Sequence, residues 1–344
     1  MKTILSNLLC FIILSSCALA EEIIAGAPSP VEITRFLENC AAAVSYTFDD
    51  GTLGHYLVVA PMLEKYGFRG TFGVVAGITK DDPESAEKSF VETGSKPGSN
   101  SPQRRRVSWK EWRELSAKGH EIANHSLTHA GLPGLPPDRL DREVNESARI
   151  ITEKVARPLS FIYPGNGRNQ EIQGFVLKTH IATRYKEQRF GGPGFNAEMA
   201  NGMMDKAIQN GEAIIIMTHA VAEAGYQTVS EADLDAHLKH MSTIRDKIWV
   251  DTLANVTRYV RERDDAKVMI QTRAANRVTF ELACPLDPTI FNVPLTCRIH
   301  AGGPVETAEC ERGGVAIPTV IAVDKILVNV VPGSVPVTVR WTTK

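Results

Sequence analysis

The chain alternates between two kinds of hydrophobic pattern. Short apolar segments rich in β-branched residues predict buried strands, whereas longer segments with apolar residues at every third or fourth position predict amphipathic helices. Seven strand–helix units follow from this alternation, with strands at residues 42–48, 70–75, 121–123, 159–163, 181–184, 213–217 and 248–250. Repeated units of this kind build parallel sheets covered by helices. The pattern therefore predicts an α/β domain of the distorted (β/α)7-barrel type.

Helix signals agree with this arrangement. The clearest helix places five apolar residues on one face: Leu140, Val144, Ala148, Ile151 and Val155. Ser108 followed by Glu111 predicts the capping-box start of another helix. Glycines occur where helices should end, at Gly67, Gly119 and Gly211.

Two regions depart from the alternating pattern. Residues 80–106 are polar and rich in Ser, Pro and Gly, which predicts a long surface loop whose residues 104–106 form a solvated basic run. After Asp264 short β-prone segments separated by Gly and Pro predict a small all-β sandwich, with a packing or spacing role. The predicted division is a signal peptide (1–20), an N-terminal lead-in (21–40), the α/β domain (41–265) and a β-rich C-terminal domain (266–344).

The N-terminus has the pattern of an export signal. Lys2 precedes an apolar run at residues 4–14 and a small-residue stretch that ends at Ala20. The run is shorter than the roughly 20 residues that span a bilayer, so no transmembrane segment is expected. We therefore expect a periplasmic, extracellular or cell-envelope protein. A lipid anchor at Cys17 stays open, because residues 14–17 also resemble a lipobox.

Charge and cysteine content narrow the partners and the redox chemistry. The 344-residue chain has a formal net charge of −2, and without a basic excess a nucleic-acid partner is disfavoured. After signal removal four cysteines remain, namely Cys40, Cys284, Cys297 and Cys310. In an oxidising compartment some of these could form a disulfide, but the sequence does not fix the pairing. We expect buried or bridged thiols without a catalytic role.

Side chains able to carry chemistry follow four of the predicted strands. They are Asp49 and Asp50 after the first strand, His125 and His129 after the third, Tyr163, Pro164 and Gly165 at the end of the fourth, and His219 after the sixth. Because the loops that follow parallel strands converge on one mouth, these groups should meet there.

Each group suggests a role. Adjacent residues of an extended chain point in different directions, so one of the two aspartates can bind a cation while the other acts as a base. His125 and His129 are four residues apart, and one helical turn would bring both imidazoles to the same side. One carboxylate and two histidines with open positions make a hydrolytic metal site.

Together these motifs resemble the NodB-homology polysaccharide deacetylases, carbohydrate esterase family four, over about residues 40–265. Residues 47–50, 125–129, 161–166 and 218–219 correspond to that family's motifs in order and spacing. The resemblance implies that Asp49 is the catalytic base and that Asp50, His125 and His129 hold a divalent metal. Zn2+ is expected first, with Co2+, Ni2+ or Fe2+ as alternatives. It also implies that His219 is the acid.

Two positions depart from the family pattern. Ile162 stands where the third motif usually has an Arg that braces the base. No acidic residue that would orient the final histidine is evident between Arg184 and Asn201. These departures affect the expected rate and substrate more than the expected reaction type.

The expected reaction is hydrolytic removal of acetyl groups from a glycan by metal-activated water. The backbone N–H of Gly165 and the neighbouring Tyr163 and Pro164 would stabilise the oxyanion or bind substrate. Polymers of N-acetylglucosamine are the first expected substrate, and O-acetylated xylan is the second. Two alternatives stay open: a non-catalytic glycan- or cell-wall-binding protein, and a 2-His-1-carboxylate iron oxygenase.

Overall fold

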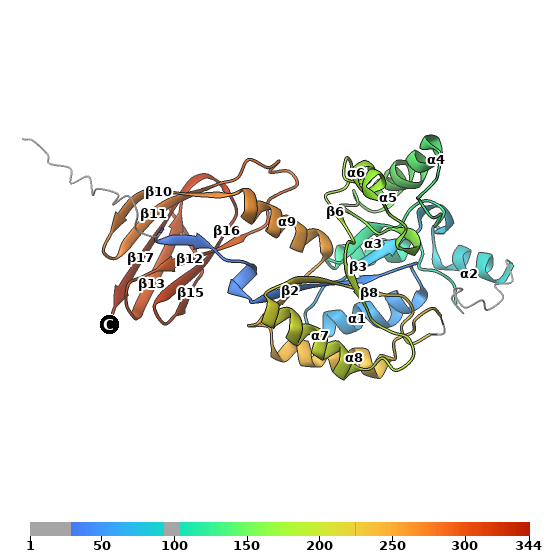
Figure 1. Cartoon of the computed structure of the whole chain (residues 1–344), viewed down its shortest axis with the longest axis horizontal. Coiled ribbons are helices and arrows are strands. Elements are labelled where there is room, and N and C mark those ends of the chain that lie inside the picture. Colours follow the sequence, from blue (N-terminus) through green and yellow to red (C-terminus); the bar gives the residue numbers. More distant parts are fainter. Residues whose placement is uncertain (1–28, 93–103, 224) are drawn as a thin grey trace, which may run out of the picture.

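The computed structural model describes residues 29–92, 104–223 and 225–344. The predicted signal peptide and Cys17 lie outside these residues. Two assemblies of strands are visible in Figure 1: a parallel sheet with helices around it, and a pair of antiparallel sheets that contains the C-terminus.

The first assembly is an eight-stranded sheet in which all neighbours are parallel. Its strands are β2 (Ala42–Phe48), β3 (Thr71–Val74), β4 (Glu121–Asn124), β5 (Ser160–Phe161), β6 (Ala182–Thr183), β7 (Glu187–Arg189), β8 (Ala213–Thr218) and β9 (Ile248–Val250). Their order is β6-β5-β4-β3-β2-β8-β7, with β9 also paired to β2. All seven predicted strands are present and the fold class is confirmed, while β7 escaped prediction. No pairing between β6 and β7 closes the sheet in the described ranges, so the barrel is incomplete.

Helices occupy the connections between these strands (Figure 1). They are α1 (Ala60–Lys65), α2 (Pro83–Glu92), α3 (Trp109–Ala117), α4 (Pro137–Asp141), α5 (Ser147–Lys154), α6 (Gln170–Val176), α7 (Ala197–Asn210), α8 (Glu231–Thr243) and α9 (Leu253–Asp265). Shorter helical segments are η1 (Leu37–Asn39), η2 (His55–Val59), η3 (Ala76–Ile78), η4 (Arg142–Glu146) and η5 (Pro164–Asn166).

The core explains why β2 is the central strand. All seven of its residues are buried, and Tyr46 and Phe48 belong to the largest hydrophobic cluster. Burial of each large apolar side chain contributes about 1.5–3 kcal/mol. The helical run from α4 through η4 to α5 confirms the predicted amphipathic helix, since Val144 and Ile151 are fully buried.

Local helix signals were mostly read correctly. Ser108 and Glu111 form the predicted capping box at the start of α3, and Gly211 ends α7 in the left-handed conformation. The prediction of a long surface loop over residues 80–106 was wrong in its first part. Residues 83–92 form α2, in which only Ala86 is buried, so hydrophobic periodicity gave little signal there.

The second assembly is an antiparallel β-sandwich. One sheet has the order β1-β12-β16-β15 and the other β10-β11-β17-β13-β14. The strands are β1 (Val31–Ile33), β10 (Lys267–Ala274), β11 (Arg277–Ala283), β12 (Leu295–His300), β13 (Val305–Arg312), β14 (Val315–Ile317), β15 (Thr319–Ala322), β16 (Lys325–Val330) and β17 (Gly333–Thr343). The predicted C-terminal all-β architecture is therefore confirmed.

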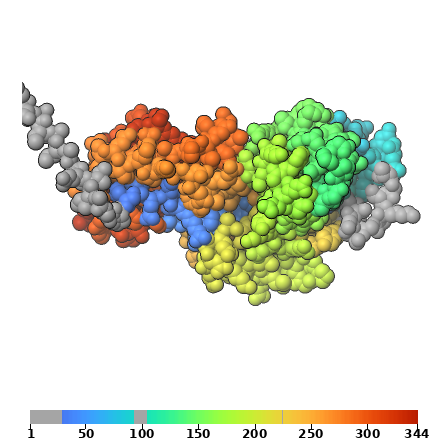
Figure 2. Space-filling view, turned by 45° about the horizontal axis from the view of Figure 1, so that its top comes forward, coloured from blue at the N-terminus to red at the C-terminus, as the bar shows by residue number. Residues whose placement is uncertain are grey.

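The N-terminal lead-in takes part in this sandwich. Strand β1 pairs with β12, with Val31 opposite Ile299, and Figure 2 shows the blue N-terminal segment against the orange and red C-terminal strands. Tyr259 of α9 also packs into the sandwich core. The domain boundaries themselves stay a prediction.

Two further features concern the cysteines and the helices. Cys40, Cys284, Cys297 and Cys310, the cysteines within the described ranges, are all free thiols. Among the helices that the structure describes, none has both the length and the apolar character needed to cross a membrane.

Candidate active site

The predicted chemical groups all emerge at the carboxyl edge of the parallel sheet. In the strand register Phe48 of β2 is opposite Thr218 of β8, so Asp49 and His219 follow at the same level. Strand β4 ends at Asn124, immediately before His125. Parallel strands thus bring together residues that are up to 170 positions apart in the chain.

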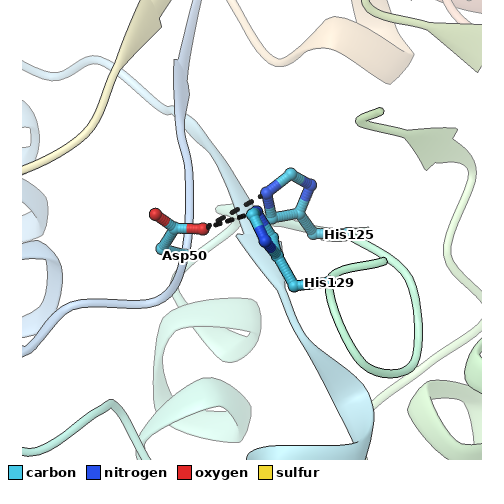
Figure 3. A group of neighbouring side chains, drawn as sticks. All are labelled: Asp50, His125 and His129. Carbon is cyan, nitrogen blue, oxygen red and sulfur yellow. Dashed lines mark ion pairs between the residues drawn. The ribbon is translucent and has the colours of Figure 1, made fainter. Parts of the chain in front are cut away.

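Asp50, His125 and His129 form a cluster suited to a metal ion. The Nε2 atoms of His125 and His129 lie 3.4 and 3.2 Å from Asp50 Oδ1. Each residue offers one ligand atom, and the three atoms lie within 4.8 Å of one another. Figure 3 shows both imidazoles turned toward the same carboxylate oxygen. The His125 side chain is buried, whereas 43% of the His129 side chain is exposed, so the cluster opens to solvent on one side.

The loop that carries the two histidines is not a helical turn, and that part of the prediction was wrong. Ser126 and His129 have positive φ angles of 69° and 64°. The two imidazole rings nevertheless meet edge to face with centroids 4.8 Å apart. Asp50 also has a positive φ of 74°, so the ligand positions depend on backbone conformations that non-glycine residues seldom adopt.

Glu143 holds this loop in place, a role that no motif in the sequence predicts. Its buried carboxylate accepts hydrogen bonds from the backbone N–H groups of Leu127 and Thr128, at 3.1 and 2.9 Å, and from the Thr128 hydroxyl at 2.6 Å. These three bonds fix the segment between the histidines. The charge-assisted bonds are of the stronger kind found in proteins.

The donor set fits a divalent metal ion. His125 Nδ1 lies 2.8 Å from the Ile162 carbonyl oxygen, which accepts its proton and leaves Nε2 facing Asp50. Second partners of this type orient metal-ligating histidines. Burial tends to raise the pKa of Asp50, but hydrogen bonds from His125 and His129 and their charges lower it well below its ordinary value. The carboxylate is thus ionised at neutral pH, as a ligand must be.

Asp49 is buried beside this cluster and is paired with Arg184. The Arg184 guanidinium donates through Nη1 to Asp49 Oδ1, and both side chains are almost fully buried. Burial tends to raise the pKa of Asp49, but the charges of Arg184 and His125 and the Arg184 hydrogen bond lower it below its ordinary value. Asp49 is therefore an ionised, unprotonated carboxylate that can accept a proton.

Arg184 is the functional residue that the sequence reasoning missed. It also donates to Asn166 Oδ1 at 3.0 Å and to Thr47 Oγ1 at 3.3 Å, so its position is fixed on three sides. Ile162, in the place where the family has its bracing Arg, is buried and contributes its carbonyl to His125. A signal was available, since Arg184 ends a predicted strand and so should reach the same carboxyl edge as Asp49.

His219 lies next to Asp49 but has few polar partners. Its Nε2 is 3.8 Å from Asp49 Oδ2, and its ring packs edge to face on Tyr226 with centroids 4.9 Å apart. Its Nδ1 is buried and lacks a hydrogen-bond partner within the described part of the chain. Burial lowers the pKa of His219 below its ordinary value, although the Asp49 and Asp50 charges oppose this shift. Within the described ranges no Asp or Glu side chain accepts a hydrogen bond from His219 Nδ1, so an acidic residue that orients this histidine is absent there.

The remaining predicted site residues have different environments. Tyr163 and Pro164 are buried, and Tyr163 packs on Phe161 in a side cluster of the core. Gly165 is exposed and has a φ of 57°. The assignment of these three residues to oxyanion or substrate binding stays a prediction.

The basic run at residues 104–106 is held by the protein rather than solvated, so that expectation was wrong for two of its members. Arg105 makes a bidentate pair with Glu111 at 2.7 and 2.8 Å. The Arg106 guanidinium donates to the backbone carbonyl of Asp50. This segment therefore supports the loop that carries Asp49 and Asp50.

Comparison with known proteins gives a family match. Residues 38–183 match the family model described as polysaccharide deacetylase. The matched segment includes Asp49, Asp50, His125 and His129. Arg184 and His219 lie beyond its end.

Two curated relatives are similar over different extents. A chitooligosaccharide deacetylase of Rhizobium leguminosarum bv. trifolii is 26% identical over 106 residues, which cover 30% of this chain and 37% of the relative. A gellan lyase of Bacillus sp is 24% identical over an alignment that covers 88% of this chain and 13% of that protein. An alignment of the latter extent includes part of the β-sandwich. This chain spans well under half of the length of either relative.

Among solved structures, a family 4 carbohydrate esterase from Streptomyces lividans in complex with acetate has a TM-score of 0.40 and 16% identity. The matched region covers 61% of this chain and 92% of the esterase chain. A likeness of this degree supports no conclusion about function.

Proposed function

We propose that the protein is a metal-dependent hydrolase that removes acetyl groups from a polysaccharide or oligosaccharide. The observation that carries this proposal is the juxtaposition of a three-residue metal cluster with a separate, buried and ionised carboxylate, Asp49. A metal-binding protein without catalysis has no need of that second carboxylate. The match of residues 38–183 to the polysaccharide deacetylase family model supports the same reaction class.

Asp50, His125 and His129 would hold the ion, with Zn2+ the first candidate on the basis of the mixed nitrogen and oxygen donors. When bound, such an ion acidifies water and polarises a carbonyl oxygen. The open side at His129 leaves access for water and substrate.

Asp49 is suited to take a proton from the attacking water. Its pairing with Arg184 keeps it ionised and fixes its orientation, and losing a general base of this kind typically lowers the rate by about 10²–10⁴-fold. His219 is suited to pass a proton to the departing sugar nitrogen or oxygen. The nearby Asp49 carboxylate, 3.8 Å from His219 Nε2, favours the protonated imidazole against the effect of burial.

The proposed substrate is an acetylated glycan. Polymers of N-acetylglucosamine are the first choice and O-acetylated xylan the second, both by analogy with the family. An exported protein, periplasmic, extracellular or bound to the cell envelope, would meet such glycans directly.

The test is acetate release from chitin oligomers, peptidoglycan and acetyl-xylan by the wild type and by Asp49→Asn. We expect the variant to bind Zn2+ as the wild type does but to release acetate about 10²–10⁴-fold more slowly. Full activity in Asp49→Asn would refute its role as base. Glycan binding without acetate release by the wild type would favour the non-catalytic alternative, and oxygen consumption would favour the oxygenase.

A further inference from the structure

A polar pocket lies beside the candidate active site and has no role in the chemistry proposed above. Its volume is about 700 Å³, and its lining includes Asn166, Arg168, Gln173, Tyr185, Glu187 and Arg189. These residues come from the loop after β5, from α6, and from the segment that enters and forms β7.

The pocket is connected to the Asp49 carboxylate through two side chains, Asn166 and Arg184. Asn166 lines the pocket, and its Oδ1 accepts a hydrogen bond from Arg184 at 3.0 Å. Arg184 in turn pairs with Asp49. A sugar unit in the pocket would therefore lie only a side chain or two away from the point where an acetyl group is attacked.

The walls have the chemistry of a carbohydrate site. The Tyr185 side chain is 50% exposed and offers an amphipathic ring, while Gln173 and Asn166 offer amide donors and acceptors. Arg168 lies over the Tyr185 ring with its guanidinium carbon 5.5 Å from the ring centre, and it donates to the Asn166 carbonyl at 3.1 Å. These contacts hold the Arg168 guanidinium at the pocket wall.

The pocket carries an excess of positive charge. Arg168 Nη2 lies 3.4 Å from Glu187 Oε2, so one guanidinium is partly balanced. Arg189 is two residues further along β7, on the same side of the strand as Glu187, and it is exposed. Within the described ranges it has no carboxylate partner in an ion pair. Guanidinium groups bind carboxylates in a bidentate manner that amides and hydroxyls cannot reproduce.

We propose that this pocket is a glycan subsite that binds the carboxylate of a uronic acid unit. The Tyr185 ring supports the sugar face, the amides bind hydroxyls, and Arg189 with Arg168 binds the carboxylate. This inference rests on the proposed function in so far as the bound glycan is the acetylated substrate, which would then be an acidic polysaccharide.

The experiment compares binding of two oligosaccharides by calorimetry. The probes are a tetramer of β-1,4-linked glucuronic acid and cellotetraose, which has the same backbone linkage without carboxylates. We expect the acidic tetramer to bind about tenfold or more tightly, because a hydrogen bond between a guanidinium and a carboxylate is stronger than one between neutral groups. Arg189→Gln should weaken binding of the acidic tetramer about tenfold, and Tyr185→Ala should weaken binding of both.

Lys206→Gln is the control, because it removes the same charge from an exposed position of α7. It should leave both affinities unchanged. Equal affinity for the two tetramers, absence of binding of the acidic one, or an Arg189→Gln variant that binds like the wild type would each overturn the proposal.

The binding result is separate from the acetate assay. Carboxylate-dependent binding that requires Arg189, in a protein that releases no acetate, would refute only the proposed function. Acetate release from neutral glycans by a protein that does not bind the acidic tetramer would refute only the subsite.

Discussion

The pairing of Arg184 with Asp49 leads to a prediction about both stability and rate. In Arg184→Met the Asp49 carboxylate, 2% exposed in its side chain, would lose its principal counter-charge and remain buried. Removing one partner of a buried pair typically destabilises a protein by about 3–5 kcal/mol. We expect a loss of this order at pH 7, measured by urea unfolding.

The pH dependence identifies the cause. The pKa of Asp49 is lowered in the folded protein, so its pairing stabilises the fold above the ordinary aspartate pKa, and this contribution is lost as the pH falls through the folded-state value. Without Arg184, burial instead raises the pKa of Asp49. The stability difference between the wild type and Arg184→Met should therefore be largest at a pH above the raised pKa of Asp49 in the variant. It should shrink as the pH falls from that value towards the lowered pKa of Asp49 in the wild type.

The pH dependence of the rate should also show the raised pKa of Asp49 in the variant. The acidic limb of kcat/KM against pH reports the base in the free enzyme, and it should move to higher pH in Arg184→Met. Arg149→Gln is a matched control, because it breaks an exposed pair with Glu153 on α5 and should change stability by no more than about 0.5 kcal/mol. An Arg184→Met variant with the unfolding curve and acidic limb of the wild type would refute the role given to Arg184.

Three further predictions concern the supporting structure. Glu143→Gln should weaken Zn2+ binding about 10–100-fold, measured by competition with a chromophoric chelator, because the residue that holds the histidine loop loses its charge and one of its two acceptor oxygens. Gly51→Ala should destabilise the fold by about 1–3 kcal/mol in urea, since φ is +64° there and a Cβ would lie 2.8 Å from a tryptophan ring atom. Its control is Gly174→Ala, in open space on α6, which should be neutral or stabilising by up to about 1 kcal/mol. Burial raises the pKa of Cys297 to about 12 and that of Cys310 to about 11, so at pH 8 a thiol reagent should label them only after unfolding.

Each of these has a clear contrary result. A Glu143→Gln variant that binds Zn2+ as tightly as the wild type would contradict the role of the Glu143 carboxylate in holding the histidine loop. A Gly51→Ala variant as stable as the wild type would show that the turn after Asp49 and Asp50 tolerates a side chain. Rapid labelling of the native protein would contradict the burial of the two thiols.

The sheet and most of the site could be predicted from the sequence because both depend on short-range patterns. Buried strands such as 42–48 are nearly continuous apolar runs. Because residues that follow parallel strands meet at the same edge of the sheet, Asp49, Asp50 and His219 are then expected in one place. Strand β7 was missed because Glu187–Arg189 is polar and only partly buried or exposed, so it lacks the apolar run of a central strand.

Long-range side-chain contacts could not be predicted in the same way. Glu143 and Arg184 support the site. The predicted strand that ends at Arg184 indicates which edge of the sheet this residue reaches, but the local sequence of neither residue shows which group its side chain contacts. Their roles depend on where helix η4 and strand β6 lie relative to the loops they hold. The histidine loop likewise adopts positive φ angles that a spacing of four residues does not reveal.

The central claim is tested most directly by metal titration of acetate release. The wild type is freed of metal by chelation, and acetate release from an acetylated glycan is followed as Zn2+ is added back, with His125→Ala alongside. The account predicts no release without metal, a linear recovery that ends at one equivalent of Zn2+ per chain, and no recovery in the variant. Acetate release that persists in the fully metal-free protein, or that recovers equally in His125→Ala, would contradict it.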